Sequence, residues 1–173
     1  AMARRLNSEM NKIGRFQALL TRHRDFFVPL RERVARARDA GADLFISIHA
    51  DATKNRKTRG LSVYTLSELA SDRETAALAE KENKADLIAG INFSEETPEI
   101  SNILIDLTRR LSMNESAKFA IGLVRQLRHQ TKVLRNTHRF AGFAVLKAPD
   151  VPSVLVELGF LSNRKDELSL IHI

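Results

Sequence analysis

Two residues that can do chemistry stand at the ends of two short apolar runs. His49 follows residues 44–48, and Glu157 follows residues 154–156. Continuous runs of β-branched and aromatic residues predict strands buried on both faces, as in parallel sheets. In such sheets, ligands bind beyond the carboxyl ends of the strands. A histidine and a carboxylate in that position could bind a metal ion or move a proton.

Each of these residues also has a purely structural interpretation. His49 could be a histidine at a sheet edge, satisfied by hydrogen bonds, and Glu157 could be a strand-end carboxylate paired with an arginine. His23 and His129 lie in Arg-rich polar runs and are predicted to be surface residues. His138 lies in a predicted loop, from which it could line a site. The residue types alone leave these alternatives open.

The chain contains no cysteine, so any metal must be held by His, Asp or Glu side chains. It also lacks a Gly-x-Ser-x-Gly elbow, a His-Glu-x-x-His helix and a glycine-rich phosphate loop. What remains is a histidine and a carboxylate on two strand ends. That combination matches zinc catalysis, in which three protein ligands leave a position open for water and a separate carboxylate moves the proton.

The formal net charge of +7 is unevenly distributed along the 173 residues. Residues 67–106 carry ten acidic side chains and three basic ones, whereas the flanking parts are basic. A basic body indicates a polyanionic neighbour. Nucleic acid is disfavoured because the chain has no Trp and one Tyr, and because the acidic block would repel phosphate. No apolar stretch is long enough to span a membrane.

Helical and strand patterns alternate along the chain. Helices are predicted over residues 2–13, 29–41, 71–83 and 97–111, with an apolar stripe that can extend the last one to residue 127. Strands are predicted over residues 16–21, 44–49, 61–66, 143–146 and 153–158. This alternation predicts a single α/β domain with a mainly parallel twisted sheet flanked by helices.

Several segments resemble one known family. Residues 42–51 read ADLFISIHAD, residues 143–147 read FAVLK, and residues 151–163 read VPSVLVELGFLSN. In this order and at this separation they resemble the zinc-dependent N-acetylmuramoyl-L-alanine amidases. The resemblance runs from about residue 1 to residue 167, and its two strand-end motifs are highly specific.

The resemblance implies an α/β catalytic domain that hydrolyses the amide between N-acetylmuramic acid and L-alanine in peptidoglycan. It matches His49 to a Zn²⁺ ligand and Glu157 to the catalytic carboxylate. The implied setting is the periplasm, where septal peptidoglycan is split during cell division. Peptidoglycan is the implied partner of the basic body because its stem peptides carry carboxylates.

The acidic block resembles the regulatory insertion of the Gram-negative cell-division members of this family. The resemblance implies a helical insertion over residues 84–112 that covers the zinc site, where a protein activator could dock. Glu95, Glu96 and Glu99 are the candidates for an acidic side chain that blocks the open position. The alternative for each of them is a solvated glutamate on a negatively charged helix.

Two parts of the sequence depart from the family pattern. The family's first strand, with an Asp-Pro-Gly-His-Gly type motif, and a glutamate near the first helix have no counterpart here. We therefore expect two further zinc ligands upstream of residue 1 and an inactive fragment. Residues 168–173 resemble a translated sequencing adaptor, so they are expected to be a non-native tail and His172 is given no function. The competing hypotheses are a non-catalytic peptidoglycan-binding or regulatory module and, more weakly, a nucleic-acid-binding protein.

Overall fold

The computed structural model describes residues 2–89 and 103–171. The helices are α1 (Met2–Ile13), α2 (Leu30–Asp39), α3 (Arg73–Asn83), α4 (Ala85–Ile88), α5 (Ile103–Leu127) and α6 (Arg164–Ile171), with a 3-10 helix η1 (Ala144–Leu146). The strands are β1 (Phe45–Asp51), β2 (Leu61–Leu66), β3 (Val133–Ala141) and β4 (Ser153–Phe160). Among the described helices, none combines the length and apolar composition needed to cross a bilayer.

The four strands form one sheet in the order β1-β4-β2-β3. β1 runs parallel to β4 and β2 runs parallel to β3, whereas the central pair β4 and β2 is antiparallel. The sequence prediction of a mainly parallel sheet flanked by helices is therefore confirmed. The antiparallel central pair was not predicted.

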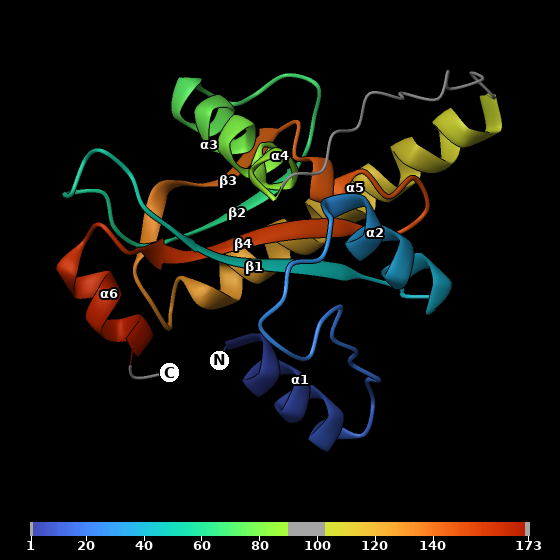
Figure 1. Cartoon of the computed structure of the whole chain (residues 1–173), viewed down its shortest axis with the longest axis horizontal. Coiled ribbons are helices and arrows are strands. Elements are labelled where there is room, and N and C mark those ends of the chain that lie inside the picture. The colour runs from blue at the N-terminus through green and yellow to red at the C-terminus, as the bar shows by residue number, and fades with distance from the viewer. Residues whose placement is uncertain (1, 90–102, 172–173) are drawn as a thin grey trace.

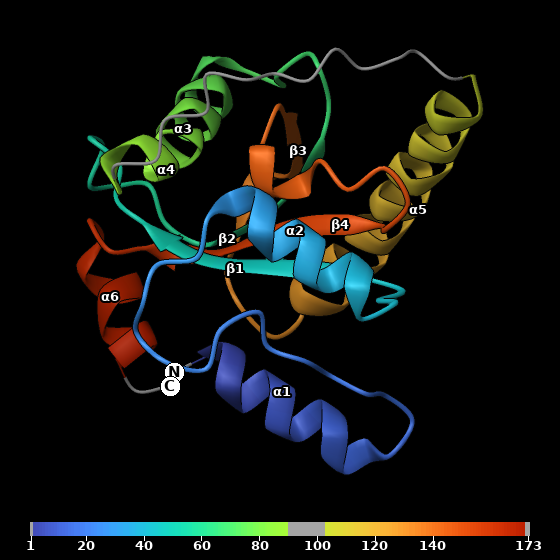
Figure 2. The same cartoon turned by 45° about the vertical axis from the view of Figure 1, so that its right-hand side comes forward.

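Helices cover both faces of the sheet (Figures 1 and 2). On one face α2, α3 and η1 enclose a core that includes Tyr64, Phe143 and Leu155. On the other face α5 packs on Val63 and Val156. Neighbouring residues of a strand point to opposite faces, so each strand contributes alternately to the two cores. Helix α1 has no buried residue and lies apart from the sheet.

The strand predicted over residues 16–21 is wrong. The backbone there is irregular because asparagine side chains of α1 take up its hydrogen-bonding groups. The N–H of Ala18 donates to Asn11 Oδ1 at 2.8 Å, and its carbonyl accepts from Asn7 Nδ2 at 2.6 Å. These contacts replace the ladder that a neighbouring strand would supply.

The strand predicted over residues 143–146 is also wrong. This segment is the 3-10 helix η1, with hydrogen bonds from Leu146 N to the Phe143 carbonyl and from Lys147 N to the Ala144 carbonyl. Its apolar side chains Val145 and Leu146 are buried, but they lie on a single helical turn rather than on a strand. Strand β3 was missed because its sequence, VLRNTHRFA, is mostly polar. Helix α6 was also missed.

A histidine–carboxylate site on neighbouring strands

The sheet brings His49 and Glu157 together. The two residues are direct register partners on the parallel strands β1 and β4. Each lies in the carboxyl-terminal half of its strand, and both strands extend two residues beyond the predicted ends. Both side chains lie on the face that α2 and α3 cover, since Leu155, two residues before Glu157, packs in that core. The structure thus brings together the histidine and the carboxylate that the sequence analysis places at two strand ends.

Glu157 is almost completely buried, with 1% of its surface exposed. Its Oε1 accepts a hydrogen bond from the backbone N–H of Asp51 at 2.7 Å, whereas its Oε2 has no partner among the described residues. Burial raises the pKa of Glu157 to about 8, helped by the charges of Asp51 and Glu82 and opposed by the Asp51 N–H and Lys81. A carboxyl group with this pKa can both accept and release a proton near neutral pH.

His49 is held between two side chains. Its Nε2 lies 2.9 Å from Ser47 Oγ, and its Nδ1 lies 2.9 Å from Glu82 Oε2 of helix α3. Nδ1 therefore faces a carboxylate oxygen, and Nε2 faces a hydroxyl group that can either donate or accept. The imidazole is therefore oriented on both sides, with Nδ1 directed toward α3.

Helix α3 has a second polar link to β1. Lys81, the residue before Glu82, forms an ion pair with Asp51 Oδ1. The other oxygen, Asp51 Oδ2, is buried without a partner among the described residues. Two consecutive residues of α3 therefore contact the two polar residues at the end of β1. The helix closes the site over the strand ends.

Three polar contacts position α3 and α4: a cap at the start of α3 and two contacts with other parts of the domain. Asp72 caps α3, accepting from the backbone N–H of Thr75 at 2.8 Å. Asn83 donates to the Gly142 carbonyl at 2.8 Å and accepts from Ala144 N at 2.7 Å.

The third contact comes from helix α4. The buried Asp86 accepts from Leu30 N at 3.0 Å, which satisfies a backbone N–H in the first turn of α2. Asn83 is the last residue of α3 and Asp86 lies in α4, so their contacts fix the position of the end of α3, where Glu82 lies.

The donors at the site have the chemistry of a zinc ligand set. An imidazole nitrogen of His49 and a carboxylate oxygen of Glu82 face each other at 2.9 Å, beside the unpartnered oxygen of Glu157. Within the described residues, no three His, Asp or Glu side chains are grouped as a metal site. The donor types at the site thus fit a zinc centre with nitrogen and oxygen ligands. The described residues supply only some of the ligands that such a centre needs.

The other histidines lie elsewhere. His23 and His129 are exposed, as predicted. His138 lies on β3 rather than in a loop, where its Nε2 is 2.9 Å from Thr65 Oγ1. It is in register with Val63, which packs on α5, so it faces the side of the sheet opposite to Glu157. His138 is not part of this site.

The predicted regulatory glutamates and the final histidine lie outside the described residues. These are Glu95, Glu96, Glu99 and His172.

Glu82 and Lys81 were missed by the sequence analysis. The helix that carries them was predicted, but an acidic residue was sought only in residues 84–112. Lys81 and Glu82 lie in the last turn of that helix, next to the predicted insertion. This position was the one sequence feature that could have indicated their role. Nothing in the sequence alone fixes the direction in which the helix crosses the strand ends.

A polar site at the strand ends is typical of enzymes built on an α/β sheet. The family model for N-acetylmuramoyl-L-alanine amidase matches residues 1–171. The chain belongs to this family. The amidase AmiC of Escherichia coli is 41% identical over 170 residues, which are 98% of this chain and 40% of that protein. AmiA of Escherichia coli K12 is 39% identical over 169 residues, covering 96% of this chain and 58% of that protein.

Solved structures of the same family share the fold. The catalytic domain of CwlV from Bacillus (Paenibacillus) polymyxa superposes with a TM-score of 0.54 at 21% identity, over 98% of this chain and 69% of that one. AmiC2 of Nostoc punctiforme gives a TM-score of 0.53 at 23% identity, over 97% of this chain and 68% of that one. The likeness confirms the α/β fold expected from the sequence.

Proposed function

We propose that this domain hydrolyses the amide bond between N-acetylmuramic acid and the L-alanine of the peptidoglycan stem peptide. The observation that carries the proposal is the buried Glu157, with its pKa raised to about 8, directly beside His49 on the neighbouring strand. Membership of the amidase family supports the reaction type and the substrate. Because the chain spans 40% of AmiC and 58% of AmiA, the activity of the whole protein is part of the proposal.

Glu157 is the proton carrier in this proposal. Its unpartnered Oε2 accepts a proton from the attacking water, and the same carboxyl then gives that proton to the leaving amine of L-alanine. The hydrogen bond from Asp51 N to Oε1 fixes the orientation of the carboxylate during both transfers. The low exposure of Glu157 keeps bulk water from competing for the proton.

His49 is a ligand of Zn²⁺ in this proposal. When bound there, Zn²⁺ would supply polarisation of the scissile carbonyl and a lower pKa of the attacking water. Nδ1 is the nitrogen directed toward the site, so a neutral His49 bound to Zn²⁺ through Nδ1 would carry its proton on Nε2 and donate it to Ser47 Oγ. Catalytic zinc needs three protein ligands, so two further donors must join His49 from residues that the described part of the chain does not bring there.

Glu82 is the acidic side chain that closes the site. Its carboxylate occupies the space in front of His49 Nδ1, where it competes with water and substrate. This assigns the blocking role to helix α3, next to the regulatory insertion proposed over residues 84–112. Glu95, Glu96 and Glu99 remain candidates for additional acidic contacts from that insertion, and a protein activator would act by drawing the α3–α4 segment away.

The wider setting follows from the family. We propose that the protein works on septal peptidoglycan in the periplasm, as part of cell separation. The net charge of +7 favours association with the carboxylates of that polymer.

The test compares a longer protein that includes this domain with its Glu157→Gln variant. Purified peptidoglycan is the substrate, and newly exposed amino termini of L-alanine are counted together with the zinc content. The proposal expects one zinc per protein in both forms, with hydrolysis abolished only in the variant. A protein that binds peptidoglycan but neither holds zinc nor hydrolyses it would instead be a non-catalytic module of the same fold.

A further inference from the structure

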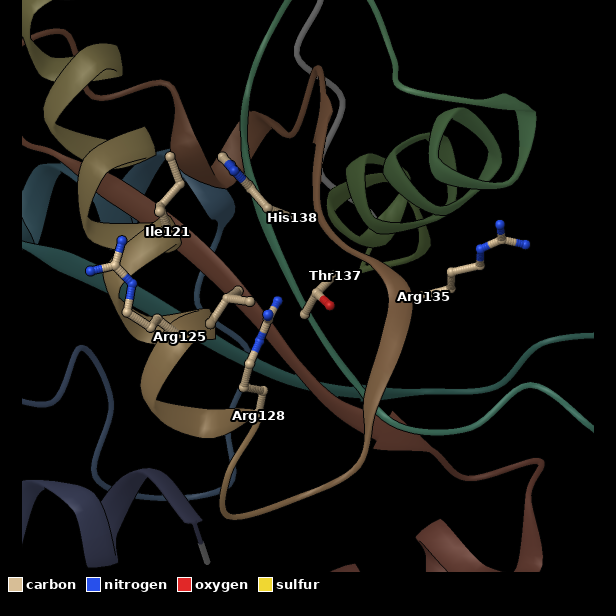
Figure 3. A pocket seen from close by; sticks show the side chains of 7 residues that line it. Ile121, Arg125, Arg128, Arg135, Thr137 and His138 are labelled. Atoms are coloured by element: carbon tan, nitrogen blue, oxygen red, sulfur yellow. The ribbon is translucent and has the colours of Figure 1, made fainter.

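A concave site lies on the side of the sheet opposite to the histidine–carboxylate site. It is a groove of about 360 Å³ between helix α5 and strand β3. Its apolar floor is Ile121 and Val124, and its polar lining comes from three arginines, Thr137 and His138. Figure 3 shows Arg128 extending from the end of α5 toward Thr137, with Arg125 beside it on the helix and Arg135 on the outer side of β3.

The groove is cationic. No Asp or Glu lines it, and within the described parts of the chain the guanidinium groups of Arg125, Arg128 and Arg135 have no ion pair or hydrogen bond. Arg139, by contrast, lies 3.4 Å from Asp72 on the other face of the sheet. A helix dipole favours cations in the last turn, which accounts for part of this cluster. It does not account for the hollow between the two elements.

An irregularity in β3 shapes this hollow. Leu61 pairs with Val133 and Val63 pairs with His138, so β3 has extra residues between the two pairs. Arg135 and Thr137 lie in this irregular stretch. Bulges of this kind redirect side chains and are common beside functional sites.

The groove is separate from the amidase site. His138 faces α5 in register with Val63, whereas Glu157 faces α3 on the other side of the sheet. A group bound in the groove therefore cannot reach Glu157 directly. It could, however, be another part of the same polymer that the catalytic face engages.

We propose that the α5–β3 groove binds a carboxylate of a peptidoglycan stem peptide, as a second contact with the polymer away from the reacting bond. This inference rests on the proposed function for its choice of polymer. Arginine guanidinium groups match the planar geometry of a carboxylate and can bind it through two hydrogen bonds. The apolar floor at Ile121 and Val124 accommodates the methyl and methylene groups that lie beside the carboxylates of a peptide.

The shape of the site favours a short peptide over nucleic acid. The volume of about 360 Å³ suits a ligand of a few residues. No Phe, Tyr or Trp side chain lines the groove to stack on bases. A double helix would be held by a broad basic surface rather than by a partly apolar hollow.

The test measures binding, so it does not depend on turnover. A soluble stem tetrapeptide with free carboxylates is titrated by calorimetry into the 173-residue chain carrying Glu157→Gln. The same chain is then titrated after the further substitution Arg128→Ala, and after Arg125→Ala with Arg128→Ala. We expect binding to weaken about tenfold with Arg128→Ala, as for loss of one charge-assisted pair, and further with the double substitution. Amide resonances of Thr137 and His138 should shift on addition of the peptide.

The matched control removes two other arginines of the same helix, Arg109→Ala with Arg110→Ala, and should bind like the parent. Three further titrations identify the ligand: the tetrapeptide with amidated carboxylates, inorganic phosphate and a DNA duplex. Loss of binding on amidation supports the proposal. Unchanged binding in the Arg128→Ala variant overturns it, as does a preference for DNA or phosphate. Hydrolysis by a longer protein is scored separately, so failure of the amidase proposal remains distinguishable.

Discussion

Glu82 on helix α3 lies with its Oε2 only 2.9 Å from Nδ1 of His49 on strand β1. The contact joins the segment beside the proposed insertion to the residue proposed to bind zinc. Both side chains are largely covered, with 16% of His49 and 20% of Glu82 exposed. The arrangement is closed, because a substrate carbonyl that approaches His49 must first displace the carboxylate of Glu82.

Replacing Glu82 should therefore raise the basal activity of a longer protein that holds zinc. A hydrogen bond to a charged group contributes about 1.5–3 kcal/mol. Removing it with Glu82→Ala should increase hydrolysis of purified peptidoglycan by roughly tenfold. The matched control is Glu80→Ala on the same helix, since Glu80 is exposed and pairs with Lys84. Equal basal rates in the Glu82→Ala variant and the unsubstituted protein would remove Glu82 from the blocking role.

The raised pKa of Glu157 makes the stability of the domain depend on pH. Because the folded state raises this pKa from 4.5 to about 8, folding favours the protonated carboxyl. The stabilisation is complete below about pH 4.5 and is lost as the pH rises through 8. The shift corresponds to an upper bound on the order of 5 kcal/mol.

The variant Glu157→Gln isolates this effect, since glutamine keeps the shape but never ionises. We expect its stability relative to the unsubstituted chain to increase between pH 5 and pH 9. Urea unfolding followed by circular dichroism at several pH values measures the difference. The exposed Glu80→Gln serves as the control and should show no gain at high pH. A difference that stays constant across this range would contradict the burial of an ionisable Glu157.

Much of the site could be predicted from the sequence because it depends on strands. The apolar runs before His49 and Glu157 identify β1 and β4, and parallel neighbours necessarily bring their carboxyl ends to one edge. The almost complete burial of the Glu157 side chain was not predicted. Residue patterns along α3 show that it is a helix but carry no signal for which side chain reaches His49.

The mispredicted elements have a common physical origin. Residues 16–21 and 143–146 have the apolar composition of strands, but tertiary contacts determine their backbone. Asn11 binds the backbone of Ala18 in the first segment, and Asn83 binds that of Ala144 in the second. Strand β3 shows the reverse case, since a polar sequence becomes a strand by pairing with β2.

The contacts of Asn83 and Asp86 should control how firmly α3 stays over the site. Asp86→Ala leaves the Leu30 N–H buried without its acceptor, which costs about 1–3 kcal/mol. Asn83→Ala removes two hydrogen bonds to the segment around η1 and should have a similar effect. Urea unfolding measures the loss of stability. In each variant, hydrogen exchange should accelerate more in α3 than in β4, relative to the unsubstituted chain. Asp150→Ala, which breaks a partly exposed pair with Arg38, is the control and should cost less than about 1 kcal/mol.

Zinc binding by the 173-residue chain should be weak. The described residues bring His49 and Glu82 together but group no three donors, whereas catalytic zinc sites use three protein ligands. After dialysis against micromolar zinc and gel filtration, we expect well under one zinc per chain and no hydrolysis of peptidoglycan. A longer protein that supplies the remaining ligands should retain one zinc, and its His49→Ala variant should lose the metal while it stays folded. Stoichiometric zinc in the 173-residue chain that survives His49→Ala would show that the metal binds elsewhere, and His49 would then return to its structural role at the edge of the sheet.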